Sequence, residues 1–125
     1  MTLRCLIVDD SPAFLATARS LLERQGFTVV ATASNAQQAL RLATDHSPDV
    51  VLLDIGLGDE SGFDVARLLS STAATAGLPV ILVSTRATED YGDLISSSPA
   101  VGFLPKVSLS AQTITDVLLS ASRGT

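Results

Sequence analysis

Residues 50–54 read VVLLD, a run of four apolar residues that ends at an aspartate. The apolar residues are consecutive and do not alternate with polar ones, which is typical of a strand buried on both faces of a parallel sheet. Four similar runs, rich in leucine and β-branched residues, lie at 3–8, 28–32, 80–83 and 101–104. Together the five runs predict a central sheet of five strands.

Helical patterns fill the intervals between these runs. Apolar residues recur at helical spacing over residues 12–25, 35–45, 62–71, 89–97 and 110–122. Asp10 or Ser11 can cap the first of these helices, and the last can be capped by Ser108 or Ser110. Strict alternation of strands and helices predicts an α/β fold with a doubly wound parallel sheet and right-handed crossovers.

Composition narrows the class of protein. The chain has 125 residues, 46% of them apolar and 17% charged, which suits one domain with a substantial core. The formal charge of -5, with its positive residues scattered, argues against a nucleic-acid or membrane surface. The one cysteine, Cys5, excludes an internal disulfide and suits a reducing compartment. Because Cys5 lies in an apolar run, we expect it to be a small core residue.

Polar residues follow four of the five predicted strands. In a doubly wound sheet, sites form beyond the carboxyl ends of the strands, so these residues should converge. They are Asp9 and Asp10, Asp54, Ser84 and Thr85, and Lys106. Three converging carboxylates would repel one another by about 4 kcal/mol per pair at roughly 4 Å and an effective dielectric near 20. Therefore either one of them stays protonated or a cation lies among them.

The types of these residues indicate which ions they would bind. Oxygen ligands without histidine or cysteine favour a hard divalent ion, Mg²⁺ first and Mn²⁺ as an alternative. Lys106, the only lysine in the chain, and Ser84 are poor ligands for such an ion but good partners for an anion beside it. A cation, a lysine and a hydroxyl around Asp54 would form a cradle for a phosphoryl group on that carboxylate.

Each of these residues also has an ordinary structural interpretation. Asp9 and Asp10 precede a helix and could simply cap it or favour its positive end. Asp54 could be a turn residue. Ser84 could be a loop hydroxyl, and Lys106 a solvated surface charge. It is the combination at adjacent strand ends that favours a site.

The combination resembles the receiver domains of two-component response regulators, the CheY-like proteins, over essentially the whole chain. The resemblance rests on the segments LIVDDSP at 6–12, LLDI at 52–55 with Ser61-Gly62, ILVS at 81–84 and GFLPK at 102–106. It implies a flavodoxin-like fold with strand order 2-1-3-4-5 and five helices. We therefore expect residues 1–125 to be a single receiver domain, either standing alone or cut from a longer regulator.

The resemblance also implies an acceptor and a metal site. Asp54 would take a phosphoryl group from a phosphohistidine of a sensor histidine kinase or a histidine phosphotransfer protein. Asp10 and Asp54 would ligate Mg²⁺ directly. Asp9 would assist through water, and the Gly56 backbone carbonyl would complete the protein ligands.

Further residues would respond to the phosphoryl group. Lys106 and Ser84 would contact its oxygens, as would backbone N–H groups of Ile55 and Thr85. Phe103 occupies the position of the family's switch aromatic, which would turn inward when Ser84 moves to the phosphate. Plain core packing is an equally good interpretation of Phe103.

The implied activity is that of a signalling switch, which assists only its own phosphorylation and dephosphorylation. Phosphorylation would repack the face formed by the fourth helix, fifth strand and fifth helix, and so change affinity for a downstream protein partner. The protein would be cytoplasmic, without direct nucleic-acid or membrane contacts, and either a monomer or a phosphorylation-dependent dimer.

Several positions depart from the family pattern. Gly58 replaces a frequent proline, so we expect a freer loop at 57–61, and Thr85 replaces a smaller residue. Pro99 should end the fourth helix early. Val107 follows the lysine where proline is common, which makes a cis peptide there doubtful. Arg86 and the glycine at 56 sit where side chains tune dephosphorylation, and no phosphoryl lifetime follows from them.

Three other functions compete with the switch. A small phosphatase with an aspartate nucleophile would place an Asp-x-Asp pattern after the first strand, which the pair Asp9-Asp10 does not match. A receiver-like interaction module that no longer uses phosphorylation would not need the intact acceptor, hydroxyl and lysine. A nucleotide-binding module lacks both the G-x-G-x-x-G pattern and the P-loop.

Overall fold

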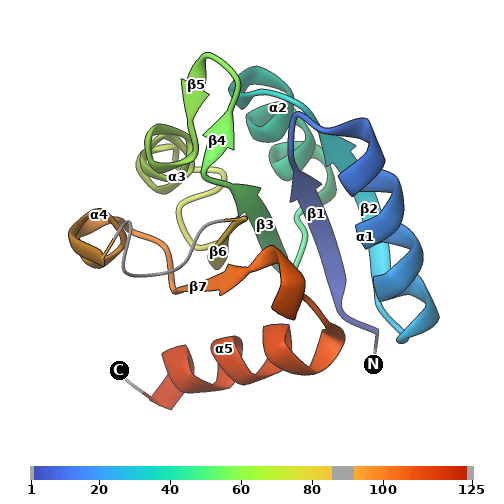
Figure 1. The fold of residues 1–125 in the computed structure, drawn as a ribbon. Coiled ribbons are helices and arrows are strands. Elements are labelled where there is room, and N and C mark those ends of the chain that lie inside the picture. Colours follow the sequence, from blue (N-terminus) through green and yellow to red (C-terminus); the bar gives the residue numbers. More distant parts are fainter. Residues whose placement is uncertain (1, 86–91, 124–125) are drawn as a thin grey trace.

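The computed structural model describes residues 2–85 and 92–123. A parallel sheet with the order β2-β1-β3-β6-β7 forms its centre (Figure 1). The strands are β1 (Arg4–Val8), β2 (Thr28–Ala33), β3 (Val50–Asp54), β6 (Val80–Ser84) and β7 (Gly102–Pro105). This confirms the predicted order of five strands, and every strand overlaps its predicted run. β1, β3 and β6 each have neighbours on both sides, which is why their sequences are continuously apolar.

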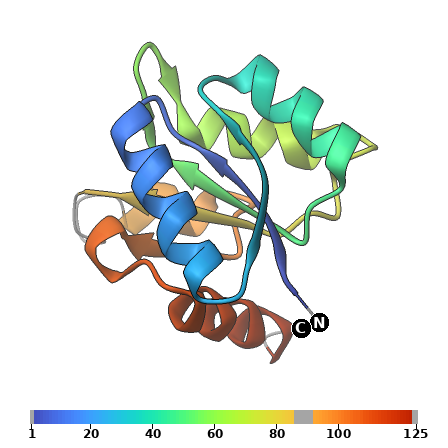
Figure 2. The same cartoon turned by 90° about the vertical axis from the view of Figure 1, so that its right-hand side faces the viewer.

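Helices cover both faces of the sheet (Figure 2). They are α1 (Pro12–Arg24), α2 (Ala36–His46), α3 (Gly62–Ser71), α4 (Gly92–Ser97) and α5 (Ala111–Arg123). α1 and α5 pack on one face, where Leu22 and Ile114 are fully buried. α2, α3 and α4 pack on the other face, through residues such as Ala39, Leu69 and Ile95. Because the helices pack on the two faces of the sheet, polar groups can lie beyond the carboxyl ends of the strands.

Short side chains fix where the helices begin. Ser11, not Asp10, is the N-cap of α1, because its hydroxyl accepts from the Phe14 N–H at 3.2 Å. At α5, Ser110 takes this role by accepting from the Thr113 N–H at 3.1 Å. Each cap resolves a choice that the sequence left open.

A small antiparallel hairpin follows β3 and was not predicted. It pairs β4 (Gly56–Leu57) with β5 (Glu60–Ser61). Gly58 stands at the first central position of the turn with φ of 62°, where a type II′ turn requires glycine. Gly58 thus occupies the turn of a short hairpin within the loop at 57–61.

Two expectations about the segment between β6 and α5 are confirmed: the fourth helix ends before Pro99, and the peptide bond after Lys106 is not cis. α4 ends at Ser97, two residues before Pro99, while the predicted start of this helix at 89 and Arg86 lie outside the described residues. Among residues 2–85 and 92–123 there is no cis peptide, so the bond between Lys106 and Val107 is trans. A short 3-10 turn, η2 (Lys106–Ser108), follows β7 and was not predicted.

Candidate functional site

Three carboxylates meet at the carboxyl ends of β1 and β3. One oxygen atom each from Asp9, Asp10 and Asp54 lies within 4.8 Å of the others. Asp9 is fully buried and Asp54 is 7% exposed, whereas Asp10 faces solvent. These three residues come together because β1 and β3 are direct neighbours and end at the same edge of the sheet.

The two oxygens of Asp9 have different surroundings. Oδ1 accepts a hydrogen bond from the Ser11 N–H at 2.8 Å, so this aspartate does support the start of α1. Oδ2 is buried, has no hydrogen bond, and lies 2.7 Å from the Lys106 ammonium. One oxygen of Asp9 therefore supports the start of α1, and the other faces the ammonium of Lys106.

Lys106 supplies the counter-charge of the cluster. Its Nζ lies 2.7 Å from Asp9 Oδ2 and 3.6 Å from Asp54 Oδ2, and its side chain is only 15% exposed. The same Nζ lies 4.2 Å from the centroid of the Phe14 ring. The lysine follows β7 directly and reaches the carboxylates across β6, so it is not a solvated surface charge.

The cluster makes Asp54 hard to ionise. Burial, followed by repulsion from Asp9, raises the pKa of Asp54 to about 6, against the opposing attraction of Lys106. One lysine therefore does not balance three carboxylates. A divalent cation among these oxygens would remove the excess negative charge.

The donor set fits a hard cation. Three residues each offer a carboxylate oxygen, and Asp9 also carries a buried oxygen, Oδ2, without a hydrogen bond. Mg²⁺ prefers such oxygen ligands and keeps water in its remaining positions, and the exposed Asp10 leaves room for that water. The predicted metal residues are therefore together in space, with Gly56 in the strand that follows Asp54 and Ile55.

The predicted hydroxyl and aromatic lie beyond the cluster along the sheet. Ser84 is buried at the end of β6, opposite Pro105 of β7, and Thr85 after it is exposed. Phe103 is half-buried and packs against the core on the side of α4. The order Asp54, Ser84, Phe103 therefore runs across three adjacent strands.

One of the two backbone donors predicted to contact a phosphoryl group, that of Ile55, is already paired within the sheet. The Ile55 N–H donates to the Val83 carbonyl at 3.0 Å, as part of the sheet. The Gly56 N–H instead donates to Asp54 Oδ1 at 3.4 Å. In this conformation the Gly56 N–H is therefore a backbone donor beside the Asp54 carboxylate.

Two glycines border the cluster closely, and the sequence analysis missed both roles. A Cβ on Gly62, the first residue of α3, would collide with the Asp54 carbonyl and lie 2.7 Å from the Ile55 Cα. A Cβ on Gly58 would lie 3.5 Å from Asp10 Oδ2. Both contacts join segments that the tertiary packing brings together, and the one sequence signal for them is the position of Gly62 at the expected start of a helix.

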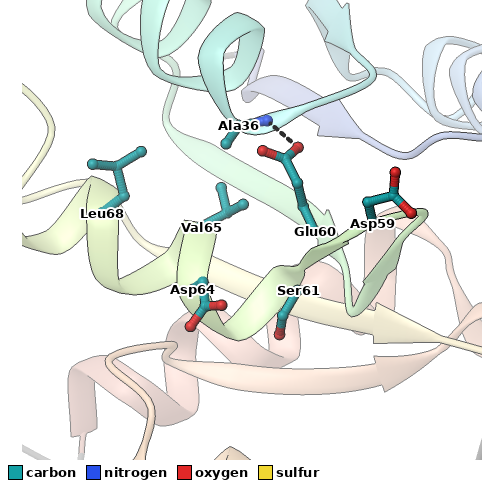
Figure 3. A pocket seen from close by; sticks show the side chains of 7 residues that line it. All are labelled: Ala36, Asp59, Glu60, Ser61, Asp64, Val65 and Leu68. Atoms are coloured by element: carbon teal, nitrogen blue, oxygen red, sulfur yellow. Dashed lines mark hydrogen bonds between the residues drawn. The ribbon is translucent and has the colours of Figure 1, made fainter.

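A separate hollow lies between the hairpin, α3 and the start of α2 (Figure 3). The Glu60 carboxylate crosses it and accepts from the Ala36 N–H at 2.9 Å. Val65 and Leu68 supply its apolar wall. None of the three clustered aspartates lines this hollow, and the hydrogen bond across it joins the hairpin to α2.

The geometry and the sequence lead to one family. Residues 5–118 match the response regulator receiver domain. The chain belongs to this family. Receiver domains act as signalling switches rather than as classical enzymes, and their family implies kinase or phosphotransfer partners.

Curated relatives of this receiver domain include both short and long proteins. The chain is 41% identical over 86 residues to the protein PilH of Pseudomonas aeruginosa, covering 69% of the chain and 70% of PilH. It is 31% identical over 106 residues to the response regulator DivK of Brucella ovis, covering 85% of each. It is 45% identical over 95 residues to the transcriptional regulatory protein KdpE of Mycobacterium tuberculosis, covering 76% of the chain but 39% of KdpE.

The chain thus spans well under half of KdpE, and 54% of another matching protein of Pseudomonas aeruginosa.

Solved structures agree on the fold. A LuxR-family response regulator from Aurantimonas has a TM-score of 0.83 at 25% identity, covering 98% of this chain and 86% of that one. The chemotaxis response regulator CheY4 of Vibrio cholerae has a TM-score of 0.79 at 21% identity, covering 97% and 99%. Within the described part of the receiver domain, no helix has the length and apolar character needed to cross a bilayer.

Proposed function

We propose that residues 1–125 form one receiver domain that accepts a phosphoryl group on Asp54 in a Mg²⁺-dependent reaction. The donor would be a phosphohistidine of a sensor kinase or phosphotransfer protein. The observation that carries this proposal is the position of the Lys106 ammonium, 2.7 Å from Asp9 and 3.6 Å from Asp54. A lysine between the acceptor and its buried neighbour is placed to contact a phosphoryl group on that acceptor.

In the proposed reaction, an Asp54 carboxylate oxygen attacks phosphorus. The new P–O bond forms as the P–N bond of phosphohistidine breaks, and the leaving imidazole keeps the electron pair and takes up a proton. Bound Mg²⁺ would neutralise charge on the phosphoryl oxygens and on the carboxylates that hold it. Asp9, Asp10 and Asp54 would hold the ion, together with the Gly56 carbonyl.

The residues of the chain then supply the remaining stabilisation. Lys106 moves its ammonium from the carboxylates to a phosphoryl oxygen. The Gly56 N–H, already directed at Asp54, donates to another oxygen. Ser84 and the Thr85 N–H approach from the next strand, so the phosphoryl group is contacted from β3, β6 and the turn after β7.

The proposed output lies on α4, β7 and α5. Each of these elements has an exposed apolar side chain on it or directly before it: Leu94 of α4 is 52% exposed, Val101 before β7 37% and Leu119 of α5 49%. Movement of Ser84 toward the phosphoryl group would free space for Phe103, which packs beside this surface. A downstream protein partner would then bind the changed surface.

The test is phosphorylation by a small donor. The protein is incubated with acetyl phosphate and Mg²⁺, and its intact mass is compared with that of Asp54→Ala and of a sample in EDTA. We expect the mass of one phosphoryl group on the wild type alone. If the wild type takes no phosphate, from acetyl phosphate or from a phosphorylated cognate kinase, the chain is an interaction module without this chemistry.

A further inference from the structure

The aromatic ring of Phe14 faces the one lysine of the chain. Phe14 lies in the first turn of α1, and Lys106 Nζ is 4.2 Å from its ring centroid. A cation at this distance from an aromatic face is attracted by the ring quadrupole, and more strongly when water is excluded. The Lys106 side chain is 15% exposed, so this contact is largely shielded from solvent.

The contact is one member of a closed circle of interactions. The Ser11 N–H donates to Asp9 Oδ1 at 2.8 Å, and the Ser11 hydroxyl accepts from the Phe14 N–H at 3.2 Å. The Phe14 ring faces Lys106, whose ammonium returns to Asp9 Oδ2 at 2.7 Å. The cap of α1 therefore sets the place of the ring, and the ring and the carboxylate together set the place of the ammonium.

The Phe14 side chain also packs against the hydrophobic core. It is half-buried and packs against the core cluster between α1, α5 and the sheet, which also contains Leu104 and Leu109 on either side of Lys106. The ring cannot turn away without leaving this cluster. The Phe14 ring is therefore held in place by packing, beside the flexible side chain of Lys106 with its four methylene groups.

We propose that Phe14 is a positioning residue that holds the Lys106 ammonium over the acceptor pocket. The inference rests on the proposed phosphorylation of Asp54. The contact between Phe14 and Lys106 matters most when a cation occupies the pocket. Asp9 then interacts with the cation as well, so it attracts Lys106 less. The neutral ring keeps its attraction, so the lysine stays poised near Asp54.

The contact can be observed without any phosphate donor. Because Lys106 is the only lysine, protein labelled with ¹³C-lysine gives one set of side-chain signals. Protons above an aromatic face are shielded by the ring current. We expect the ε-methylene protons to be shifted upfield in the wild type and in Phe14→Tyr, and to move toward the free-lysine position in Phe14→Leu. An unshifted wild-type signal would overturn the contact.

The kinetic test uses acetyl phosphate and Mg²⁺ with the same proteins. We expect Phe14→Leu to be phosphorylated about fivefold more slowly, within the roughly two- to thirty-fold range of cation–π contacts, and Phe14→Tyr to retain the wild-type rate. Phe27→Leu is the matched control, since Phe27 packs against the same core cluster and should keep the wild-type rate. Thermal unfolding verifies that each variant is folded.

A double-mutant comparison shows whether Phe14 acts through the lysine. On a Lys106→Ala background, Phe14→Leu should cause no further slowing. A positioning role would be refuted if Phe14→Leu were phosphorylated at the wild-type rate, or if Phe27→Leu slowed phosphorylation as much as Phe14→Leu does. It would also be refuted if the effects of Phe14→Leu and Lys106→Ala on the rate were fully additive. If the wild type takes no phosphate while its shielded lysine signal disappears in Phe14→Leu, the proposed function falls and the positioning contact stands.

Discussion

Replacing Asp54 by asparagine should stabilise the metal-free protein at neutral pH. Asparagine keeps the shape of the side chain and an acceptor for the Gly56 N–H, but removes the charge that Asp9 and burial oppose. Raising a pKa from 3.8 to about 6 corresponds to about 3 kcal/mol, at 1.36 kcal/mol per pH unit. This is the expected gain in free energy of unfolding well above pH 6.

The gain should depend on pH with a defined sign. Between about pH 4 and pH 6 the folded protein holds a proton on Asp54 that the unfolded chain releases, so wild-type stability falls as pH rises through this window. Below pH 4 both states are protonated, and the aspartate costs nothing. The difference between Asp54→Asn and wild type should therefore grow from near zero at pH 4 to its full value by pH 8.

Urea unfolding in EDTA at pH 4, 5, 6, 7 and 8 measures this difference. Asp64→Asn is the control, because Asp64 is an exposed carboxylate in a surface ion pair with Arg67 and should change stability little. Saturating Mg²⁺ should cancel most of this difference, because at a hundred times the Kd it stabilises the wild type by about 2.7 kcal/mol and the variant much less. A difference that is flat with pH, or a destabilised Asp54→Asn at pH 8, would refute the electrostatic reasoning.

Three further perturbations test other parts of the site. Lys106→Ala leaves a buried carboxylate without its counter-charge and should lower stability by about 3 kcal/mol or more in EDTA, with Lys106→Arg restoring part of it, both by urea unfolding. Gly62→Ala pushes a Cβ into the Asp54 backbone and should cost about 1–3 kcal/mol and slow phosphorylation, whereas Gly92→Ala, with open space around it, should do neither. Cys5 is fully buried with a pKa raised to about 12 by burial, so Ellman's reagent at pH 8 should react only as fast as the protein opens; immediate reaction would contradict the core position.

The strands and most of the helices could be predicted from local pattern. A strand with neighbours on both sides, such as β3, must be apolar at every position, and that signal needs no tertiary information. The helix bounds were close because Ser11 and Ser110 are strong caps. The β4–β5 hairpin could not be predicted in this way, because strands of two residues are too short to show an apolar or alternating pattern.

The candidate site divides in the same way. Asp9, Asp10, Asp54 and Lys106 could be found because a parallel sheet brings strand ends to one edge, whatever the details of packing. The separate contact that each carboxylate oxygen makes could not be predicted, since it depends on which partner each oxygen faces. The sequence does not show that one oxygen of Asp9 caps α1 while the other meets Lys106.

By itself, then, the sequence determined the alternation of buried strands and helices, and the identity of the charged groups that follow the strands. Only the tertiary structure decided what surrounds them: Phe14 over Lys106, Gly62 against Asp54, and Gly58 beside Asp10. The physical reason is that burial and capping act over a few neighbouring residues. Contacts such as that of Phe14 with Lys106 join elements far apart in the chain, and their distances are set by how the helices pack on the sheet.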